Sequence, residues 1–477
     1  MSFLPASPRS SLRGFSEFCA VGFLAVCAAL PPARSANWPA WRGPNGDGTT
    51  TTARNLPETW GPGKNIKWKQ EMPAWSGSSP VVWGDRIFIN SPSKEEAQPA
   101  AEPTAPAPKG RRGPPGGRGG FVGGGPRGPA TRGPGGQELL LLCLDRATGR
   151  ELWRKEVDRG NQIRMKHNSS SPSPVTDGRH VWVISGNGVI RCYDFAGNEK
   201  WTLDVPGKFG KFGHNHGYGS SPVLLDGKLI IEVLHGMKTD DPSYLLALNA
   251  ADGKVLWRVE RPTDALYESP DAYTTPAVLE VGGKKQLVVS GGDYVTGHDA
   301  ETGAEIWRSA GLNPQKKRDY RIVPSPTVRD GMIFAPTRKV PLLALKAGGK
   351  GDISTSHLAW KWTGDNAPDV PTPVSDGPRF YMVGDEGQIT CLDAKTGAVI
   401  YGPENTGIGR TWGSPILADG KIYITGETAE TAVVQAGPAY KLLAKNSLDG
   451  TYTLSTPAFA DGEIFLRTAT TLYCISR

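Results

Sequence analysis

The chain has 477 residues, including 61 glycines and 41 prolines, a composition that suits a protein built from many hairpin turns. Its formal net charge is +7, but residues 1–36 contribute +2 and residues 91–137 contribute +4. The rest of the chain is close to neutral, which argues against a broad basic surface and predicts no nucleic-acid partner.

Residues 1–36 have the layout of a secretory signal peptide. Two arginines precede an apolar run over residues 18–30, and small side chains follow it. The run is too short for a membrane span, so we expect no transmembrane segment after signal removal. A lipoprotein anchored through Cys27 is the alternative to a soluble exported protein. Either form would be periplasmic or associated with the cell envelope.

A segment that begins with Ser/Thr-Pro and continues through a short stretch to a turn, most often Asp-Gly, recurs eight times along the chain. Successive copies are 42–54 residues apart, except for one interval of 94 residues. A period of this length indicates one supersecondary unit copied around a ring or along a stack. The blades are therefore expected to start near the eight prolines, which are Pro80, Pro174, Pro222, Pro276, Pro326, Pro373, Pro415 and Pro457.

Each repeat contains four short apolar segments separated by turn residues such as Asp226-Gly227 and Asp252-Gly253. Four antiparallel strands per repeat are typical of a propeller blade. We therefore predict an all-β fold, an eight-bladed β-propeller spanning residues 37–477. The last repeat ends after its third strand, and residues 65–68 near the N-terminus are expected to supply the fourth strand and close the ring.

Two repeated residue types are expected to be structural. A tryptophan near the fourth strand, as in Trp153 and Trp257, is predicted to dock against the neighbouring blade rather than to stack on a ligand. One position in the third strand holds cysteine in some repeats and alanine or glycine in others, which indicates a tight packing site. The cysteines there are expected to be reduced and buried, and they are Cys143, Cys192, Cys391 and Cys474.

Residues 91–137 account for the long interval and are rich in glycine, proline and arginine. This composition cannot bury a core and predicts a disordered insertion in blade one. A tolerated loop and a flexible basic arm near the mouth of the ring are the two interpretations.

The candidate binding site lies in the loops that link consecutive blades, because polar and aromatic residues gather there and all these loops fall on one face. The candidates are Trp75, His167, His214, His216, Tyr218, Tyr273, Arg321, Asp369, Arg410 and Trp412. No set of residues completes a catalytic mechanism, so no catalytic residue is predicted. His214 and His216 could form half of a metal site, but without a third ligand ordinary loop histidines are favoured and no metal is predicted.

The repeated pattern of a Cys-Leu-Asp triplet, a Thr-Gly turn and a tryptophan, as in residues 143–153, resembles the PQQ-like repeat of quinoprotein-type propellers. The opening segment NWPAWRGPNGDG, with Trp38, Trp41, Arg42 and Gly43, is similar to exported members of that family. The resemblance covers residues 37–477 apart from the insertion. It implies the propeller fold, and it implies function less strongly.

Two functions are compatible with this resemblance. A quinoprotein oxidoreductase acting on alcohols or sugars would bind pyrroloquinoline quinone and calcium, but the vicinal cysteine pair typical of such enzymes is missing. The other function is that of a BamB-type scaffold, which binds proteins. We favour an exported, monomeric, non-catalytic propeller without a cofactor, which binds an envelope protein or a small ligand at its loop-rich face.

Overall fold

The computed structural model describes residues 36–95 and 135–477, which belong to the unit Ser35–Arg477. The expected signal peptide and most of the expected insertion lie outside the described residues. Within the described residues the structure is nearly all β, with one short helix, α1 (Val205–Phe209).

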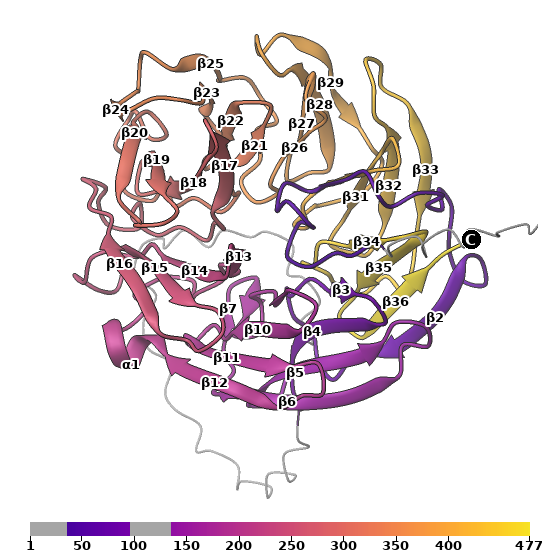
Figure 1. Cartoon of the computed structure of the whole chain (residues 1–477). Helices are drawn as coiled ribbons and strands as arrows, with labels where there is room; N and C mark the ends of the chain where they lie inside the picture. The colour runs from indigo at the N-terminus through magenta and orange to yellow at the C-terminus, as the bar shows by residue number, and fades with distance from the viewer. Residues whose placement is uncertain (1–35, 96–134) are drawn as a thin grey trace, which may run out of the picture. The chain divides into compact units, whose positions relative to one another are not determined.

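Eight sheets follow one another around a ring, and each contains four antiparallel strands that lie side by side in order from the centre to the rim (Figure 1). Blades one and two comprise β3 (Val81–Trp83), β4 (Arg86–Pro92), β5 (Glu138–Asp145), β6 (Glu151–Arg159), β9 (Val175–Thr176), β10 (His180–Ile184), β11 (Val189–Asp194) and β12 (Glu199–Asp204). Blades three and four comprise β13 (Val223–Leu225), β14 (Lys228–Val233), β15 (Tyr244–Asn249), β16 (Val255–Glu260), β17 (Ala277–Val281), β18 (Lys284–Gly291), β19 (Tyr294–Asp299) and β20 (Glu305–Ser309).

The second half of the ring repeats this plan. Blades five and six comprise β21 (Thr327–Arg329), β22 (Met332–Ala335), β23 (Leu342–Lys346), β25 (Leu358–Trp362), β26 (Val374–Ser375), β27 (Arg379–Val383), β28 (Gln388–Asp393) and β29 (Val399–Asn405). Blades seven and eight comprise β30 (Ile416–Ala418), β31 (Lys421–Thr425), β32 (Thr431–Gln435), β33 (Leu442–Asn446), β34 (Ala458–Ala460), β35 (Glu463–Arg467), β36 (Thr471–Ile475) and β2 (Ile66–Glu71).

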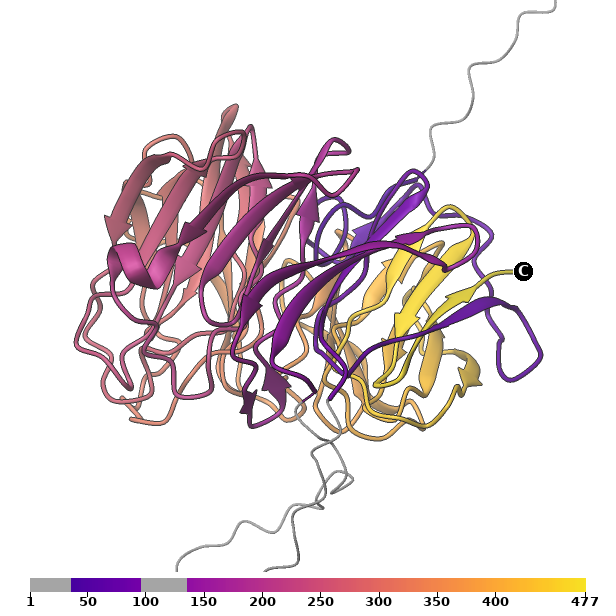
Figure 2. The same ribbon diagram turned by 90° about the horizontal axis from the view of Figure 1, so that it is seen from below.

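The predicted eight-bladed propeller is therefore confirmed, including its closure. The N-terminal strand β2 pairs antiparallel with the C-terminal strand β36, so the last blade contains strands from both ends of the chain. Two blades also gain a short parallel strand, β1 (Thr49–Thr50) beside β30 and β24 (Gly351–Asp352) beside β20. Figure 2 shows the ring from the side, with the strands running between its two faces.

The repeated tryptophans pack between blades, as the sequence predicted. Trp201 of blade two donates its indole N–H to the Ala250 carbonyl oxygen of blade three at 2.9 Å. Its ring lies against Gly253 in the turn that joins β15 and β16, where an added Cβ would come within 2.6 Å of the indole. The same arrangement joins Trp68 to Gly149 and Trp257 to Gly303. A turn glycine is needed because its missing Cβ lets the ring approach.

The small residues of the third strand lie directly opposite these rings. Cys143 pairs with Trp153, Cys192 with Trp201, and Cys474 with Trp68 in the strand register. A side chain larger than cysteine would occupy the space that the indole fills. All four cysteines in the described residues are buried and free, and burial raises the pKa of the Cys143 thiol to about 12.

Blade seven has no tryptophan on its fourth strand, and the closure of the ring explains why. In blade eight the third and fourth strands come from opposite ends of the chain, so no glycine turn joins them. Trp60 from the N-terminal segment packs there instead, stacked on Tyr423 with ring centroids 6.3 Å apart. The Trp60 backbone N–H also donates to Asn446 Oδ1 at 2.9 Å.

Candidate ligand and partner site in the central channel

The Ser/Thr residues of the eight Ser/Thr-Pro dipeptides form a closed ring of hydrogen bonds around the channel. Each backbone N–H donates to the side-chain hydroxyl oxygen of the equivalent residue in the next blade, over 2.8–3.1 Å. The ring closes when Thr456 donates to Ser79, 377 residues away in the sequence. Its members are Ser79, Ser173, Ser221, Thr275, Ser325, Thr372, Ser414 and Thr456.

The N-terminal segment 36–56 lies across one end of the channel, on the face of the turns between first and second strands. Trp38 bridges to Val82 of blade one, and Thr49 pairs with Leu417 of blade seven. The buried Arg42 guanidinium donates to the carbonyl oxygens of Thr372 and Pro373 of blade six at 2.8 and 2.6 Å. Several blades thus hold this segment in place.

The opposite end of the channel, on the face of the loops between blades, is crossed by a hairpin. It consists of β7 (Ile163–Arg164) and β8 (His167–Asn168) and comes from the connection between blades one and two. At its tip, the Lys166 ammonium lies 3.2 Å from the ring centroid of Trp412 in blade seven. The Tyr452 hydroxyl, before blade eight, donates to the Lys166 carbonyl oxygen at 3.2 Å. The hairpin therefore spans the mouth.

Between these two closures lies a cavity of about 210 Å³, which we call the chamber. Trp41 lines both the chamber and the hollow on the turn face, so its indole forms the chamber floor. Six hydroxyl groups of the Ser/Thr ring lie in the wall. The other lining residues are Gly77, Arg164, Met165, Lys166, His167, Ser171, His216, Gly219, Tyr273, Arg321, Val323, Val370, Trp412 and Leu454.

The chamber has an excess of positive charge. No aspartate or glutamate is among its lining residues, whereas Arg164, Lys166 and Arg321 are. Arg321 pairs with Asp369 at 3.3 Å. Neither Arg164 nor Lys166 forms an ion pair with any residue that the structure describes, and burial lowers the pKa of Lys166.

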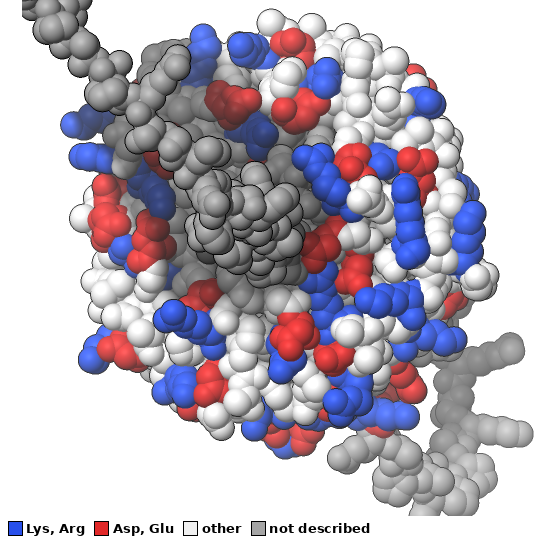
Figure 3. Space-filling view, turned by 45° about the vertical axis from the view of Figure 1, so that its right-hand side comes forward, with Lys and Arg blue, Asp and Glu red and all other residues white. Residues whose placement is uncertain are grey.

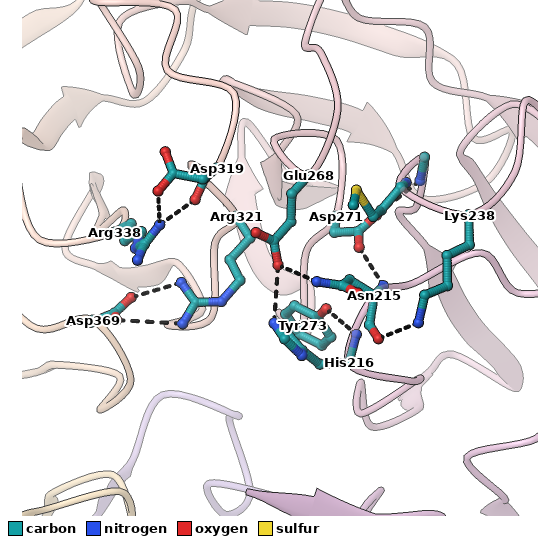
Figure 4. A network of polar contacts seen from close by, with 12 residues as sticks. Asn215, His216, Lys238, Glu268, Asp271, Tyr273, Asp319, Arg321, Arg338 and Asp369 are labelled. Atoms are coloured by element: carbon teal, nitrogen blue, oxygen red, sulfur yellow. Dashed lines mark hydrogen bonds and ion pairs between the residues drawn. The ribbon is translucent and has the colours of Figure 1, made fainter. Parts of the chain in front are cut away.

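Figure 4 shows the network that holds the mouth residues on the side of blades three to five. Glu268 accepts from the Asn215 side-chain amide at 3.0 Å, and the same carboxylate oxygen lies 3.0 Å from His216 Nε2. The Tyr273 hydroxyl accepts the His216 backbone N–H at 3.0 Å. Asp271 is fully buried and accepts the backbone N–H of Asn215 at 2.6 Å, and burial raises its pKa to about 6. These contacts fix the loop around His216.

The sequence-predicted candidates divide into three groups in the structure. Five line the chamber, and Asp369 pairs with one of them, Arg321, at its rim. Two others, His214 and Tyr218, line a separate neighbouring hollow of about 320 Å³. Trp75 and Arg410 line neither cavity: Trp75 is buried against Tyr452, and Arg410 faces Glu386 at 3.6 Å. The five chamber residues are His167, His216, Tyr273, Arg321 and Trp412.

The interior position of His214 and Tyr218 makes them unsuitable for contact with a protein partner. Their side chains are 4% and 1% exposed. The two ring nitrogens of His214 and the Tyr218 hydroxyl have no hydrogen-bond partner within 3.5 Å among the described residues. Burial lowers the pKa of His214 to about 3, so the imidazole is neutral at physiological pH.

Several chamber residues were not predicted from the sequence. Trp41 was noted only as part of the opening segment, and its position in the floor depends on contacts with distant blades. Lys166 lies beside the predicted His167, but nothing in the sequence shows that it reaches Trp412. The Ser/Thr ring was detected as a repeat, without its hydrogen bonding.

Exposed apolar side chains also mark the loop face. Ile163 and Met165 of the hairpin are 41% and 74% exposed, and Leu266 and Tyr267 in the loop before blade four are 61% and 55% exposed. On the side shown in Figure 3, basic and acidic side chains alternate over the blades. No described helix is long and apolar enough to span a membrane.

Comparison with known proteins agrees with this architecture. The family model described as outer membrane protein assembly factor BamB matches residues 138–335 and 243–477. The chain belongs to the BamB family. The BamB protein of Yersinia pestis is 24% identical over 350 residues, which cover 71% of this chain and 80% of that protein. BamB of Escherichia coli is 20% identical over 345 residues, 62% of this chain and 82% of that protein.

Solved structures with the same fold include one BamB protein and enzymes. BamB from Moraxella catarrhalis matches with a TM-score of 0.50 at 11% identity, over 72% of this chain and 92% of that protein. A quinohemoprotein alcohol dehydrogenase from Comamonas testosteroni matches with a TM-score of 0.62 at 10% identity, over 93% of this chain and 81% of that enzyme. At these identities the likeness concerns the fold of the BamB-family chain and not its activity.

Proposed function

We propose that this chain is an exported, non-catalytic scaffold that binds a protein partner in the cell envelope and assists outer-membrane protein assembly. Membership of the BamB family carries the proposal, because the relatives are named as outer membrane protein assembly factors. The expected signal peptide supports export. The scaffold works as a monomer in this proposal.

The loop face is the proposed docking surface. Exposed apolar side chains such as Met165 and Tyr267 project from two loops of this face, and clustered exposed apolar groups mark protein interfaces. Arg318 lies over the Tyr267 ring at 4.9 Å, which adds the arginine–aromatic combination common at interface centres. A partner seated there would cover the hairpin and the chamber mouth.

Site-specific photo-crosslinking tests this surface. A photoreactive phenylalanine analogue at Met165 is expected to capture an outer-membrane assembly protein in cells of the source organism. The same analogue at Val399, which is 51% exposed on the outer strand β29, is the matched control and is expected to capture none. Equal capture at both positions, or capture only at Val399, would place the interface elsewhere.

The alternative function, a quinoprotein oxidoreductase, is favoured by the extent of its structural match, 93% of this chain. The chamber suits its calcium poorly, because calcium takes six to eight oxygen ligands that include carboxylates. No acidic residue lines the chamber, and no group of three or more His, Cys, Asp or Glu in the described part of the chain is arranged to hold a metal. The residues present therefore do not fit the calcium that this cofactor would bring.

Titration with pyrroloquinoline quinone and calcium, followed by absorbance and dye reduction, separates the two functions. The scaffold proposal expects no calcium-dependent binding and no alcohol- or sugar-dependent reduction of the dye. Turnover with either substrate class would contradict it.

A further inference from the structure

The chamber has the construction of a ligand site rather than of a packing defect. Its wall is the hydrogen-bonded Ser/Thr ring, its floor is the indole of Trp41, and the hairpin tip at Lys166 covers its mouth. All three parts are tied to several blades, so the cavity cannot collapse without breaking these contacts. Its volume of about 210 Å³ corresponds to roughly seven water molecules, the scale of one sugar ring rather than of a peptide.

The wall offers hydrogen-bond donors in excess. Each hydroxyl oxygen of the ring already accepts a backbone N–H from the neighbouring blade, as Ser221 does from Ser173. A hydroxyl also carries one donor hydrogen, and for the ring members no acceptor of that hydrogen is found among the described residues. The ligand should therefore present several acceptor oxygens at its edge.

The charges specify the ligand further. Lys166 and Arg164 line the chamber without an ion pair in the described structure. Two carboxylates, Asp369 and Asp385, are close enough for their charge to act on Lys166, but both have other partners. Asp369 forms an ion pair with Arg321. Asp385 accepts the backbone N–H groups of Asp369 and Val370 at 3.0 and 3.2 Å. Arg164 and Lys166 are both exposed on the hairpin. Arg164 donates to the side-chain oxygen of Gln162, and the Lys166 ammonium lies over the Trp412 ring. Neither contact neutralises the positive charge, and a carboxylate is an anion that Lys and Arg bind readily.

The floor adds a planar apolar surface. Trp41 is half-buried and faces the chamber, where Leu454, Val323 and Val370 supply further apolar wall. An aromatic plane beneath a ring of polar groups suits a ligand with one apolar face and a polar edge, and a pyranose ring has both.

We propose that the chamber binds a small carboxylate that carries a hydroxylated ring, that is, an acidic monosaccharide. The carboxylate lies near Lys166 and Arg164, the ring hydroxyls receive hydrogen bonds from the Ser/Thr ring, and the apolar face of the sugar rests on Trp41. The chamber lies beneath the proposed protein-docking surface and shares the hairpin with it. Binding of a small ligand in the chamber can nevertheless be measured without a protein partner, so the two proposals are tested separately.

Isothermal titration calorimetry of the mature full chain with D-galacturonate tests the proposal. D-galactose is the matched neutral ligand, because it differs only at C6, where a hydroxymethyl group takes the place of the carboxylate. Galacturonate is expected to bind and galactose to bind at least about tenfold more weakly, the discrimination that one charge-assisted contact provides. Equal affinity for the two sugars, or no heat of binding with galacturonate at millimolar concentration, would overturn the proposal.

Substitutions assign the binding to the chamber. Lys166→Met keeps the alkyl stem and removes the charge, and it is expected to weaken galacturonate binding about tenfold or more while thermal stability is retained. Lys211→Met is the control, because Lys211 is exposed on a neighbouring loop and does not line the chamber. Unchanged affinity in Lys166→Met, or an equal loss in both variants, would contradict the assignment.

Discussion

Single buried ionisable side chains carry specific consequences for stability. Glu232 in β14 is 1% exposed, and its Oε1 accepts from the Thr274 hydroxyl at 2.8 Å. Its Oε2 has no partner among the described residues, and burial raises the pKa of Glu232 to about 8. The carboxyl is therefore largely protonated in the folded state at neutral pH, whereas it is ionised in the unfolded chain.

Glu232→Gln is expected to change how stability depends on pH. Because the folded-state pKa is raised, the wild type loses stability as pH rises from about 4.5 to about 8, and glutamine removes this loss. The free energy of unfolding of the variant relative to the wild type should rise between pH 5 and pH 8 by on the order of 3 kcal/mol. Urea denaturation at the two pH values measures it.

The control for this prediction is Glu301→Gln, which alters an exposed glutamate paired with Lys228. Its stability relative to the wild type should stay nearly constant over the same pH range. If Glu232→Gln also shows a constant difference, Glu232 does not hold a proton in the folded state.

At the scale of the structural element, the contact between a tryptophan and a turn glycine is the repeated joint between blades. The tryptophan buries apolar surface worth ~2–3 kcal/mol. The indoles of Trp153, Trp201 and Trp360 also donate to a backbone carbonyl oxygen of the next blade. The glycine is needed twice over, for its positive φ and for the space that its missing Cβ leaves. In blade three Gly253 has φ +71° and lies against Trp201.

Two glycines of blade three separate these two requirements. Gly227 has φ +75°, close to that of Gly253, but no atom lies within 4 Å of an added Cβ. Gly227→Ala should lower the free energy of unfolding by about 1 kcal/mol through backbone strain alone. Gly253→Ala should cost about 1–3 kcal/mol more, because its Cβ would meet Trp201 at 2.6 Å. Chemical denaturation measures both variants. If Gly227→Ala and Gly253→Ala lower the free energy of unfolding by the same amount, the Trp201 indole moves aside at no cost.

At the scale of the whole molecule, the ring is closed by strands from the N-terminal and C-terminal parts of the described chain. The β2–β36 pairing closes the last blade, and the buried Arg467 of that blade donates to the carbonyl oxygens of Asn90 and Ala74 in and before blade one. Closure removes the open sheet edge that the three C-terminal strands would leave. The N-terminal segment 36–56 then covers one end of the channel.

Replacing residues 96–134 by a short glycine-serine linker is expected to leave the thermal midpoint almost unchanged. The flanking residues are already adjacent, since the Gly136 backbone N–H donates to the Ser93 carbonyl oxygen at 2.7 Å, beyond the paired strands β4 and β5. A short loop can therefore join them. A large drop in the thermal midpoint would contradict the expectation. A second variant with a linker of different length shows whether such a drop comes from the linker itself.

Much of the fold could be predicted because each blade has the same short sequence pattern, which recurs at a regular interval along the chain. The prolines mark each first strand, and the Cys, Ala or Gly opposite each tryptophan follows from the size of the ring. The candidate site could be predicted only in part. His214 and His216 are two residues apart in the sequence, yet His214 is buried beside Tyr218 and His216 lines the chamber. Loop conformation, which no period constrains, separates them.

The sequence by itself determined the number of blades, the closure by the N-terminal strand and the structural roles of the repeated residues, because each depends on strand pairing or packing that recurs with the repeat. The tertiary structure alone decided the chamber. Its floor, wall and cover come from Trp41, the Ser/Thr ring and Lys166, which are brought together by ring closure over hundreds of residues. Only the closed ring places Arg164 and Lys166, the donor hydroxyls and the indole around one cavity.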